Sequence, residues 1–166
     1  FLAANTQIAF PDYTNFDGLR AWAVVEIKNK AFREIRFTGD FVMNNLEVVN
    51  NGEFLESIFD GIFEGIKIKK IGGLAFPYSN FSGSLNLPVC EQIGDGAFNN
   101  SNFSGSLDLP ACTYIGDSAF VESNFSGSLS LPLCEQIGGE AFSYSNFSGS
   151  LNLPVCTFIG NNAFRN

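Results

Sequence analysis

A 22-residue repeat constrains this chain more strongly than any other feature of its sequence. An Ala-Phe pair, replaced once by Glu-Phe, recurs at that spacing and ends at Phe10, Phe32, Phe54, Phe76, Phe98, Phe120, Phe142 and Phe164. A second Phe column runs from Phe37 to Phe147, and an Ile or Val column runs from Ile27 to Ile159. A unit of 22 residues is too short to bury its own apolar face, so the three columns predict stacked units that share one continuous core.

Each unit contains one segment with the pattern of a short, half-buried strand. Leu85 and Leu87 alternate with Ser84 and Asn86, and Pro88 then ends the strand because it has no N–H to donate. No stretch keeps helical periodicity for ten residues. The chain is therefore expected to be a β-rich solenoid with a parallel strand ladder, few or no long helices, and a rise of ~4.8 Å per turn.

The repeated motif resembles the BspA-like class of leucine-rich repeats. The matching runs are LNLPVCEQIGDGAF, LDLPACTYIGDSAF, LSLPLCEQIGGEAF and LNLPVCTFIGNNAF. The resemblance implies a right-handed, curved solenoid with a parallel sheet on its concave face. It also implies a secreted or cell-surface protein that adheres to host proteins or to neighbouring cells. The family offers no catalytic residues to transfer to this chain.

The whole chain, residues 1–166, is predicted to be a single leucine-rich-repeat solenoid. Its turns are degenerate over 1–70 and regular over 71–166. No polar capping unit follows Phe164, although terminal repeats normally need one. We therefore expect either a fragment of a larger protein or an open end that self-associates end to end.

Composition and charge exclude several classes of function. The net charge of −8 opposes binding to nucleic acid or to an anionic membrane, and no apolar run approaches the ~20 residues of a transmembrane span. The chain has no histidine, the residue that most often serves as a general base. Every Lys and Arg except Arg165 lies between Arg20 and Lys70, among acidic residues, so no basic stripe forms. We predict a non-enzymatic protein with no catalytic residues, no metal and no cofactor.

Four cysteines form a column of their own at Cys90, Cys112, Cys134 and Cys156. Earlier turns hold Val24, Leu46 and Ile68 in the same column, which favours a core position where Cys acts as a small hydrophobe. Disulfides between adjacent turns are the alternative, although parallel Cβ vectors disfavour them. Metal ligation is the least favoured interpretation.

Two further polar patterns have a structural and a functional interpretation. The Asn-Phe-Ser runs at Asn80, Asn102, Asn124 and Asn146 are formal glycosylation acceptors, but a hydrogen-bonded Asn ladder is favoured. The carboxylates Glu91, Asp95, Asp117, Glu135 and Glu140 follow one edge of the stack. A paired-carboxylate hydrolase and a calcium site are possible there, and a solvated edge is favoured because Gly, Asn and Thr interrupt the columns.

Candidate ligand-binding residues fall in two groups. The polar residues that flank the strand leucines are Ser84, Asn86, Ser106, Asp108, Ser128, Ser130, Ser150 and Asn152. The positions that vary after each Ala-Phe pair are Tyr78, Asn100, Glu122 and Tyr144. Evenly spaced polar groups on a rigid ladder suit an extended protein or glycan partner, from a host or a neighbouring cell. We predict a binding or adhesion module, with a structural spacer or self-assembly domain as the alternative.

Overall fold

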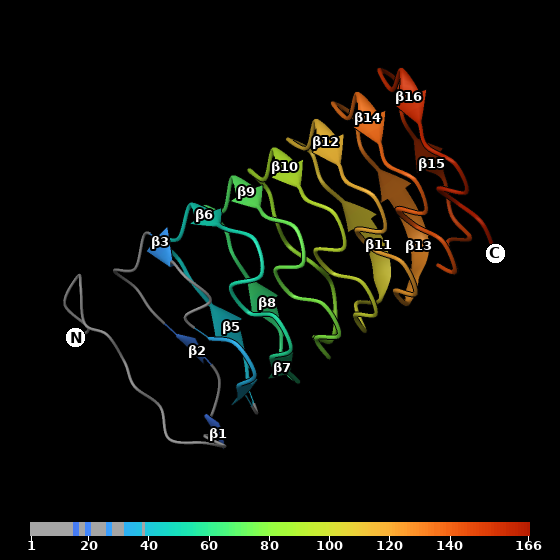
Figure 1. The fold of residues 1–166 in the computed structure, drawn as a ribbon. Helices are drawn as coiled ribbons and strands as arrows, with labels where there is room; N and C mark the ends of the chain where they lie inside the picture. Colours follow the sequence, from blue (N-terminus) through green and yellow to red (C-terminus); the bar gives the residue numbers. More distant parts are fainter. Residues whose placement is uncertain (1–14, 17–18, 21–25, 28–31, 38) are drawn as a thin grey trace.

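The computed structural model describes residues 15–16, 19–20, 26–27, 32–37 and 39–166. These residues form a stack of parallel turns along one axis, with the C-terminal turn at the far end (Figure 1). Strands pair in parallel with the strand 22 residues later, as Gln92 does with Tyr114 and Tyr114 with Gln136. The described residues contain no helix. The predicted β-solenoid of 22-residue units is confirmed.

The longest sheet uses the Ile and Val column and contains seven strands. They are β3 (Glu26–Ile27), β6 (Val48–Val49), β9 (Lys70–Ile71), β10 (Gln92–Ile93), β12 (Tyr114–Ile115), β14 (Gln136–Ile137) and β16 (Phe158–Ile159). In the central strands the second residue is buried and the first is exposed. This sheet follows the stack from one end to the other, although the sequence pattern predicted no strand at these positions.

The predicted ladder of Leu-x-Leu strands forms in two separate sheets. The first contains β2 (Leu19–Arg20), β5 (Phe41–Val42) and β8 (Phe63–Glu64), and the second contains β11 (Gly105–Asp108), β13 (Phe125–Ser130) and β15 (Leu151–Asn152). Between them, the turn with Leu85 and Leu87 contributes only one bridge, from Asn86 to Glu64. A further sheet joins β1 (Asn15–Phe16), β4 (Arg36–Phe37) and β7 (Ile58–Phe59). The strand predicted over 84–87 is therefore reduced to one bridge.

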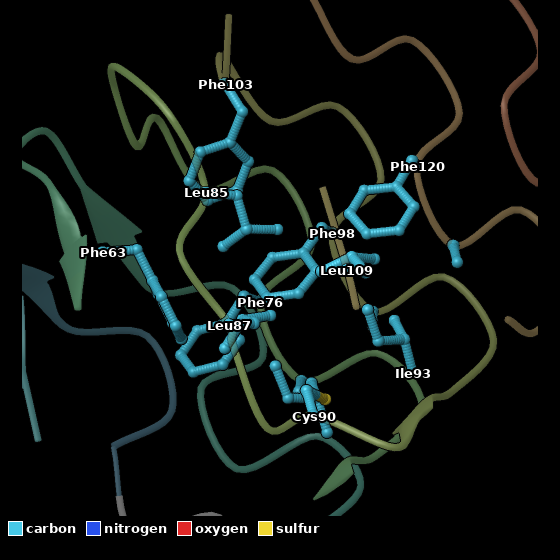
Figure 2. Close-up of a cluster of buried hydrophobic side chains, with 14 of the residues drawn as sticks. Phe63, Phe76, Leu85, Leu87, Cys90, Ile93, Phe98, Phe103, Leu109 and Phe120 are labelled. Atoms are coloured by element: carbon cyan, nitrogen blue, oxygen red, sulfur yellow. The ribbon is translucent and has the colours of Figure 1, made fainter. Parts of the chain in front are cut away.

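Two columns of phenylalanine rings run through the core, where Leu, Ile and Cys side chains pack beside them (Figure 2). Phe76 stacks on Phe98 with centroids 5.5 Å apart and planes at 9°, and Phe81 stacks on Phe103 at 5.6 Å. Within one turn, Phe98 meets Phe103 edge to face at 80°. Edge-to-face and offset-stacked rings are the arrangements that aromatic quadrupoles favour, so each ring is held both by its own turn and by its neighbours.

The cysteine column lies at the edge of this core, and all four cysteines are free thiols. Cys90, Cys112 and Cys134 are buried. The Sγ of Cys90 donates to the carbonyl of Gln92 at 3.4 Å, and Cys112 and Cys134 repeat the contact at 3.3 Å. Burial raises the pKa of the Cys90 thiol to about 12 and that of Cys134 to about 11. The favoured prediction of free, buried thiols is confirmed for Cys90, Cys112 and Cys134, whereas Cys156 in the last turn is free but only half-buried.

The asparagine column is a structural ladder over three turns. The Nδ2 atom of Asn102 donates to Oδ1 of Asn80, and Nδ2 of Asn124 donates to Oδ1 of Asn102 at 2.8 Å. In the next turn, the backbone N–H of Asn146 donates to the carbonyl of Phe125 at 3.0 Å. The predicted ladder of side-chain amides is confirmed from Asn80 to Asn124.

Candidate binding surfaces

The polar residues that flank the strand leucines form one surface, which we call the Leu-x-Leu face. Its first predicted column contains Ser84, Ser106, Ser128 and Ser150, and most of these hydroxyl groups make hydrogen bonds within the fold. The hydroxyl oxygen of Ser106 accepts the backbone N–H of Ser128 at 3.0 Å, and the hydroxyl oxygen of Ser128 accepts that of Ser150 at 3.1 Å. The Ser150 hydroxyl in turn donates to Ser128 at 3.2 Å. Ser84 is exposed and precedes the break in this ladder. These serines connect successive turns, which reduces the hydrogen-bonding capacity that they can offer to a ligand.

The second predicted column is more available. Asp108 pairs in register with Ser130, and Ser130 with Asn152. Asn86, Asp108 and Asn152 are exposed, while Ser130 is half-buried. Within the described part of the chain, none of these four side chains makes a hydrogen bond. The structure therefore brings together Asp108, Ser130 and Asn152 as a polar row at strand spacing.

The variable positions after each Ala-Phe pair share an unusual backbone conformation. The φ values of Tyr78, Asn100, Glu122 and Tyr144 are 58°, 56°, 57° and 60°. This left-handed region is uncommon for residues other than glycine. The N–H groups of Tyr78 and Asn100 each donate to the next turn at 2.8 Å, so the backbone is held while the Tyr78 side chain remains exposed.

Tyr144 occupies the same position near the last turn. Its N–H donates to the carbonyl of Arg165 at 2.7 Å, and the Arg165 guanidinium carbon lies 5.8 Å from the centroid of its ring. That distance is within the range of a cation–π contact. Asn100 is half-buried, whereas Glu122 and Tyr144 are exposed. The loop residues therefore form a row along one edge, fixed by the backbone and variable in their side chains.

The carboxylate edge supports the fold through two of its members. Oδ1 of Asp95 accepts the N–H of Asp117 at 3.0 Å, and Oδ1 of Asp117 accepts the N–H of Gly139 at 2.6 Å. Glu91 and Glu135 are exposed. No group of three or more Cys, Asp or Glu side chains in the described residues is arranged to hold a metal ion. The arrangement is that of a solvated edge in which Asp continues the hydrogen-bond ladder.

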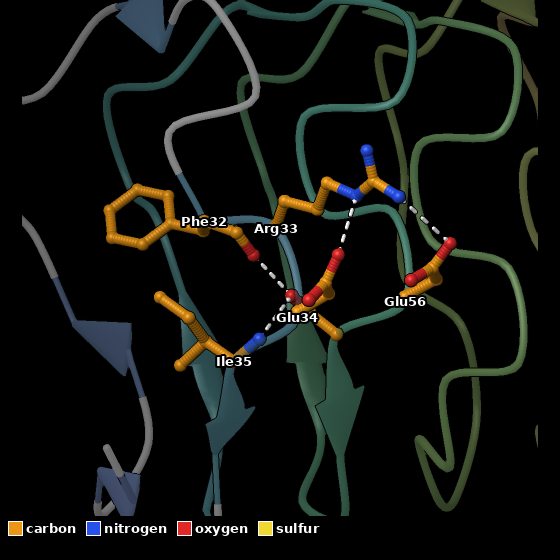
Figure 3. Close-up of polar contacts among 6 residues, drawn as sticks. Phe32, Arg33, Glu34, Ile35 and Glu56 are labelled. Atoms are coloured by element: carbon orange, nitrogen blue, oxygen red, sulfur yellow. Dashed lines mark hydrogen bonds and ion pairs between the residues drawn. The ribbon is translucent and has the colours of Figure 1, made fainter. Parts of the chain in front are cut away.

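Charged residues of the degenerate turns form ion pairs both within a turn and between turns. Nε of Arg33 lies 3.0 Å from Oε1 of Glu34, and Nη2 of Arg33 lies 3.2 Å from Oε1 of Glu56 (Figure 3). Nζ of Lys69 lies 2.9 Å from Oε2 of Glu47. These pairs are exposed to solvent, so they contribute little to stability. Because Arg33 and Lys69 are both paired with carboxylates, they do not form an anion-binding patch.

The sequence pattern did not anticipate one pocket on the outer face of the seven-stranded sheet. It has a volume of about 250 Å³ and is lined by Asn51, Lys70, Ile71, Gly72, Gly73, Gln92, Gly94, Asp95 and Tyr114. Lys70, Gln92 and Tyr114 are paired neighbours on β9, β10 and β12. The signal that could have revealed it is Gly73, which stands in a column where Asn51 and Asp95 carry side chains.

The comparisons with known proteins agree with this architecture. Residues 65–166 match the family described as BspA type Leucine rich repeat region, in six copies. No curated protein and no solved structure gave a match. Among the described residues, no helix is long and apolar enough to cross a membrane. The family match covers more than half of the sequence and confirms the predicted resemblance. The chain belongs to the BspA-type leucine-rich repeat family.

Proposed function

We propose that this chain is a non-enzymatic binding module of a secreted or cell-surface protein, which adheres to a protein or glycan of a host or neighbouring cell. The observation that carries the proposal is the polar row of Asp108, Ser130 and Asn152, held in register on the Leu-x-Leu face. A ladder of this kind presents polar groups at about 4.8 Å intervals. Such a spacing suits an extended partner that makes one contact with each turn.

Family membership supports the general class of function. Leucine-rich-repeat solenoids typically serve as non-catalytic scaffolds for binding, and BspA-type members are typically surface or secreted proteins. The regular turns add charge selectivity, because residues 71–164 contain seven acidic residues and no Lys or Arg. We therefore expect a neutral or basic partner on the Leu-x-Leu face, and no nucleic acid.

Arrays of glycans and extracellular-matrix proteins test this proposal. We expect at least one array component to bind, and Asp108→Lys and Asn152→Tyr to weaken that binding. Glu135→Lys is the matched control, because Glu135 is also exposed but lies beside the seven-stranded sheet, on another face. Binding that survives both substitutions on the Leu-x-Leu face would refute the assignment of the site to this row.

The second candidate is a spacer or self-assembly domain, and the exposed apolar residues of the last turn favour it. Leu151 is 57% exposed, whereas Leu129 in the preceding turn is 1% exposed, and Ile159 is 50% exposed where Ile137 is fully buried. A second copy of this chain that packed on the last turn would cover these side chains. Light scattering across a range of concentrations tests self-association, and Leu151→Ser with Ile159→Ser should abolish any growth in mass. A constant monomer mass would argue against self-assembly.

A further inference from the structure

We propose that the pocket on the seven-stranded sheet binds one sugar ring of a neutral, extended glycan chain, with the ring packed against Tyr114. This site is separate from the Leu-x-Leu face, so it does not depend on the polar row of Asp108, Ser130 and Asn152. Its volume of about 250 Å³ is smaller than the roughly 300–1,000 Å³ typical of drug-sized ligands. The pocket therefore admits one small ring and leaves the rest of a longer ligand on the surface.

The floor of the pocket is made by residues without side chains. Gly72, Gly73 and Gly94 lie along it, and a Cβ at Gly72 or Gly94 would come within 2.5 Å of the backbone of the previous turn. Gly73 has more room than Gly72 and Gly94. The atom nearest to a Cβ added at Gly73 would be the carbonyl oxygen of Asp95, at 3.2 Å. The hollow therefore exists because Gly73 replaces the Asn or Asp that neighbouring turns carry at this position.

One wall of the pocket is aromatic and rigid. Tyr114 is 38% exposed on β12. The next residue of this strand, Ile115, is fully buried in the core and anchors the strand there. An outward tyrosine on a paired strand presents a flat, amphipathic surface that loses little conformational entropy on binding. The axial C–H groups of a pyranose ring pack on such a face, while its hydroxyls point to the sides.

The polar groups around the ring offer both donors and acceptors. Oδ1 of Asn51 accepts the N–H of Gly73 at 2.9 Å, which holds the side chain and leaves its Nδ2 as a donor. Oδ1 of Asp95 accepts the N–H of Asp117 at 3.0 Å, which leaves Oδ2 as an acceptor. The amide of Gln92 provides both functions. Hydroxyl groups both donate and accept, so this mixture matches a sugar.

Charge complementarity selects a neutral ligand. Lys70 and Asp95 both line the pocket, and their opposite charges balance within it. An anionic polymer would also meet Asp117, whose backbone N–H donates to Oδ1 of Asp95 in the pocket lining, and residues 71–164 hold no cation to offset these carboxylates. A cationic ligand would be attracted by Asp95 and Asp117 but placed against Lys70, whose charge offsets part of that attraction. Neutral hydroxyl-rich chains avoid both penalties.

A second aromatic residue on the same strand column favours an extended chain. Tyr114 pairs with Gln136, and Gln136 pairs with Phe158, which is also exposed. Two strand spacings place Phe158 roughly 9.6 Å from Tyr114 along the stack. A glycan whose sugar units repeat at about the strand spacing would place alternate rings on Tyr114 and Phe158, with Gln136 between them.

Calorimetry and affinity electrophoresis with defined oligosaccharides test the proposal. The probes are cellohexaose, mannohexaose and N-acetylchitohexaose as extended neutral chains, with hyaluronan and heparin oligosaccharides as anionic comparisons. We expect at least one neutral probe to bind with a Kd at or below the order of 1 mM, and Tyr114→Ala to weaken it at least about tenfold. Leu133→Ala is the matched control, because Leu133 is 52% exposed and lies outside the pocket and outside both groups of candidate binding residues, so its loss should leave the Kd unchanged.

A second pair of variants tests the pocket without removing an aromatic ring. Gly73→Asn restores the side chain found in neighbouring turns and fills the hollow, so it should preserve folding and abolish binding. Gly139→Asn makes the same change in the same column, three turns away, and should bind like the parent protein. The proposal is overturned if no neutral probe binds, if only anionic probes bind, or if Tyr114→Ala and Gly73→Asn both leave binding intact. Sugar binding lost only in Asp108→Lys and Asn152→Tyr would assign the glycan to the Leu-x-Leu face instead.

Discussion

The hydroxyl oxygen of Ser106 accepts a hydrogen bond at 3.0 Å from the backbone N–H of Ser128, one turn further along the stack. Ser128 repeats the contact with Ser150. Asp95 and Asp117 do the same at another corner of the turn. Polar side chains at fixed positions thus extend the backbone ladder where the chain turns. In each case the side-chain oxygen accepts a backbone N–H of the following turn.

This relationship predicts that Ser128→Ala destabilises the fold by about 0.5–1.5 kcal/mol, because the N–H of Ser150 loses its partner. The matched control is Ser130→Ala, which is two residues away on β13 and makes no side-chain hydrogen bond within the described residues. Urea unfolding followed by circular dichroism measures both. Equal midpoints for the two variants would show that the serine ladder contributes no net stability.

We expect substitution of a corner glycine to destabilise the fold more than the loss of the Ser128 hydroxyl does. A Cβ at Gly116 would lie 2.6 Å from the backbone nitrogen of Asp95 and 2.7 Å from the backbone carbon of Gly94. Gly116→Ala must therefore push two turns apart, and we expect a loss of more than about 2 kcal/mol of unfolding free energy. Gly83→Ala is the comparison, since its φ of 78° imposes backbone strain but nothing lies within 4 Å of the added atom. Thermal unfolding should rank Gly116→Ala as the less stable of the two.

The left-handed residues offer a route to higher stability. Glu122 has a φ of 57° and an exposed side chain. Glycine adopts this region without the steric penalty, so Glu122→Gly should stabilise the protein by up to about 1 kcal/mol. Glu122→Val should destabilise it, because a β-branched residue is least compatible with positive φ. Asn100→Gly should gain less, since Asn tolerates this region better than Glu does. A higher melting temperature for Glu122→Val than for Glu122→Gly would contradict this explanation.

The buried thiols predict a loss of stability in alkali. Burial raises the pKa of Cys90 from 9.0 to about 12, so the unfolded state releases this proton at a lower pH than the folded state does. The protonated Cys90 thiol therefore contributes to the free energy of unfolding. This contribution is fully present below pH 9 and is lost as the pH rises toward 12, at a rate that approaches about 1.4 kcal/mol per pH unit. Burial also raises the pKa of Cys112 and Cys134.

Urea unfolding between pH 7 and pH 11 measures this dependence. Cys90→Val is the control, because the same column accepts Val, Leu and Ile in earlier turns. Its stability should fall less steeply above pH 9 than that of the parent chain. In the folded protein at pH 8, a thiol reagent should modify Cys156 first, since it is the one cysteine that is not buried. Equal reactivity of all four thiols would contradict the core assignment.

Several features of the fold were predictable because the repeat copies them. The Phe columns, the cysteine column and the Asn80–Asn124 ladder each follow from one residue type recurring at one spacing. The seven-stranded sheet was not predictable from alternation, because each of its strands is only two residues long and shows no period. The break in the Leu-x-Leu ladder at Leu85 and Leu87 also gave no signal, since that turn has the same sequence pattern as its neighbours.

For the candidate sites, the sequence identified the polar residues but not their roles. Ser106 and Ser128 were predicted as ligand contacts, and the structure engages their hydroxyls between turns. The pocket beside Tyr114 combines side chains from different turns with the missing side chain of Gly73. No single repeat contains that combination, so no motif within one repeat could indicate it.

The period, the parallel stacking and the residues of the core follow from the repeat alone, because a 22-residue unit cannot bury its apolar columns without its neighbours. Which polar side chains are free to bind depends on how the turns pack on one another. That choice depends on whether the next turn places a backbone N–H within reach, as it does for Ser106 and for Asp95. It also depends on hollows such as the one at Gly73, which arise from contacts between turns rather than from the order of residues within one of them.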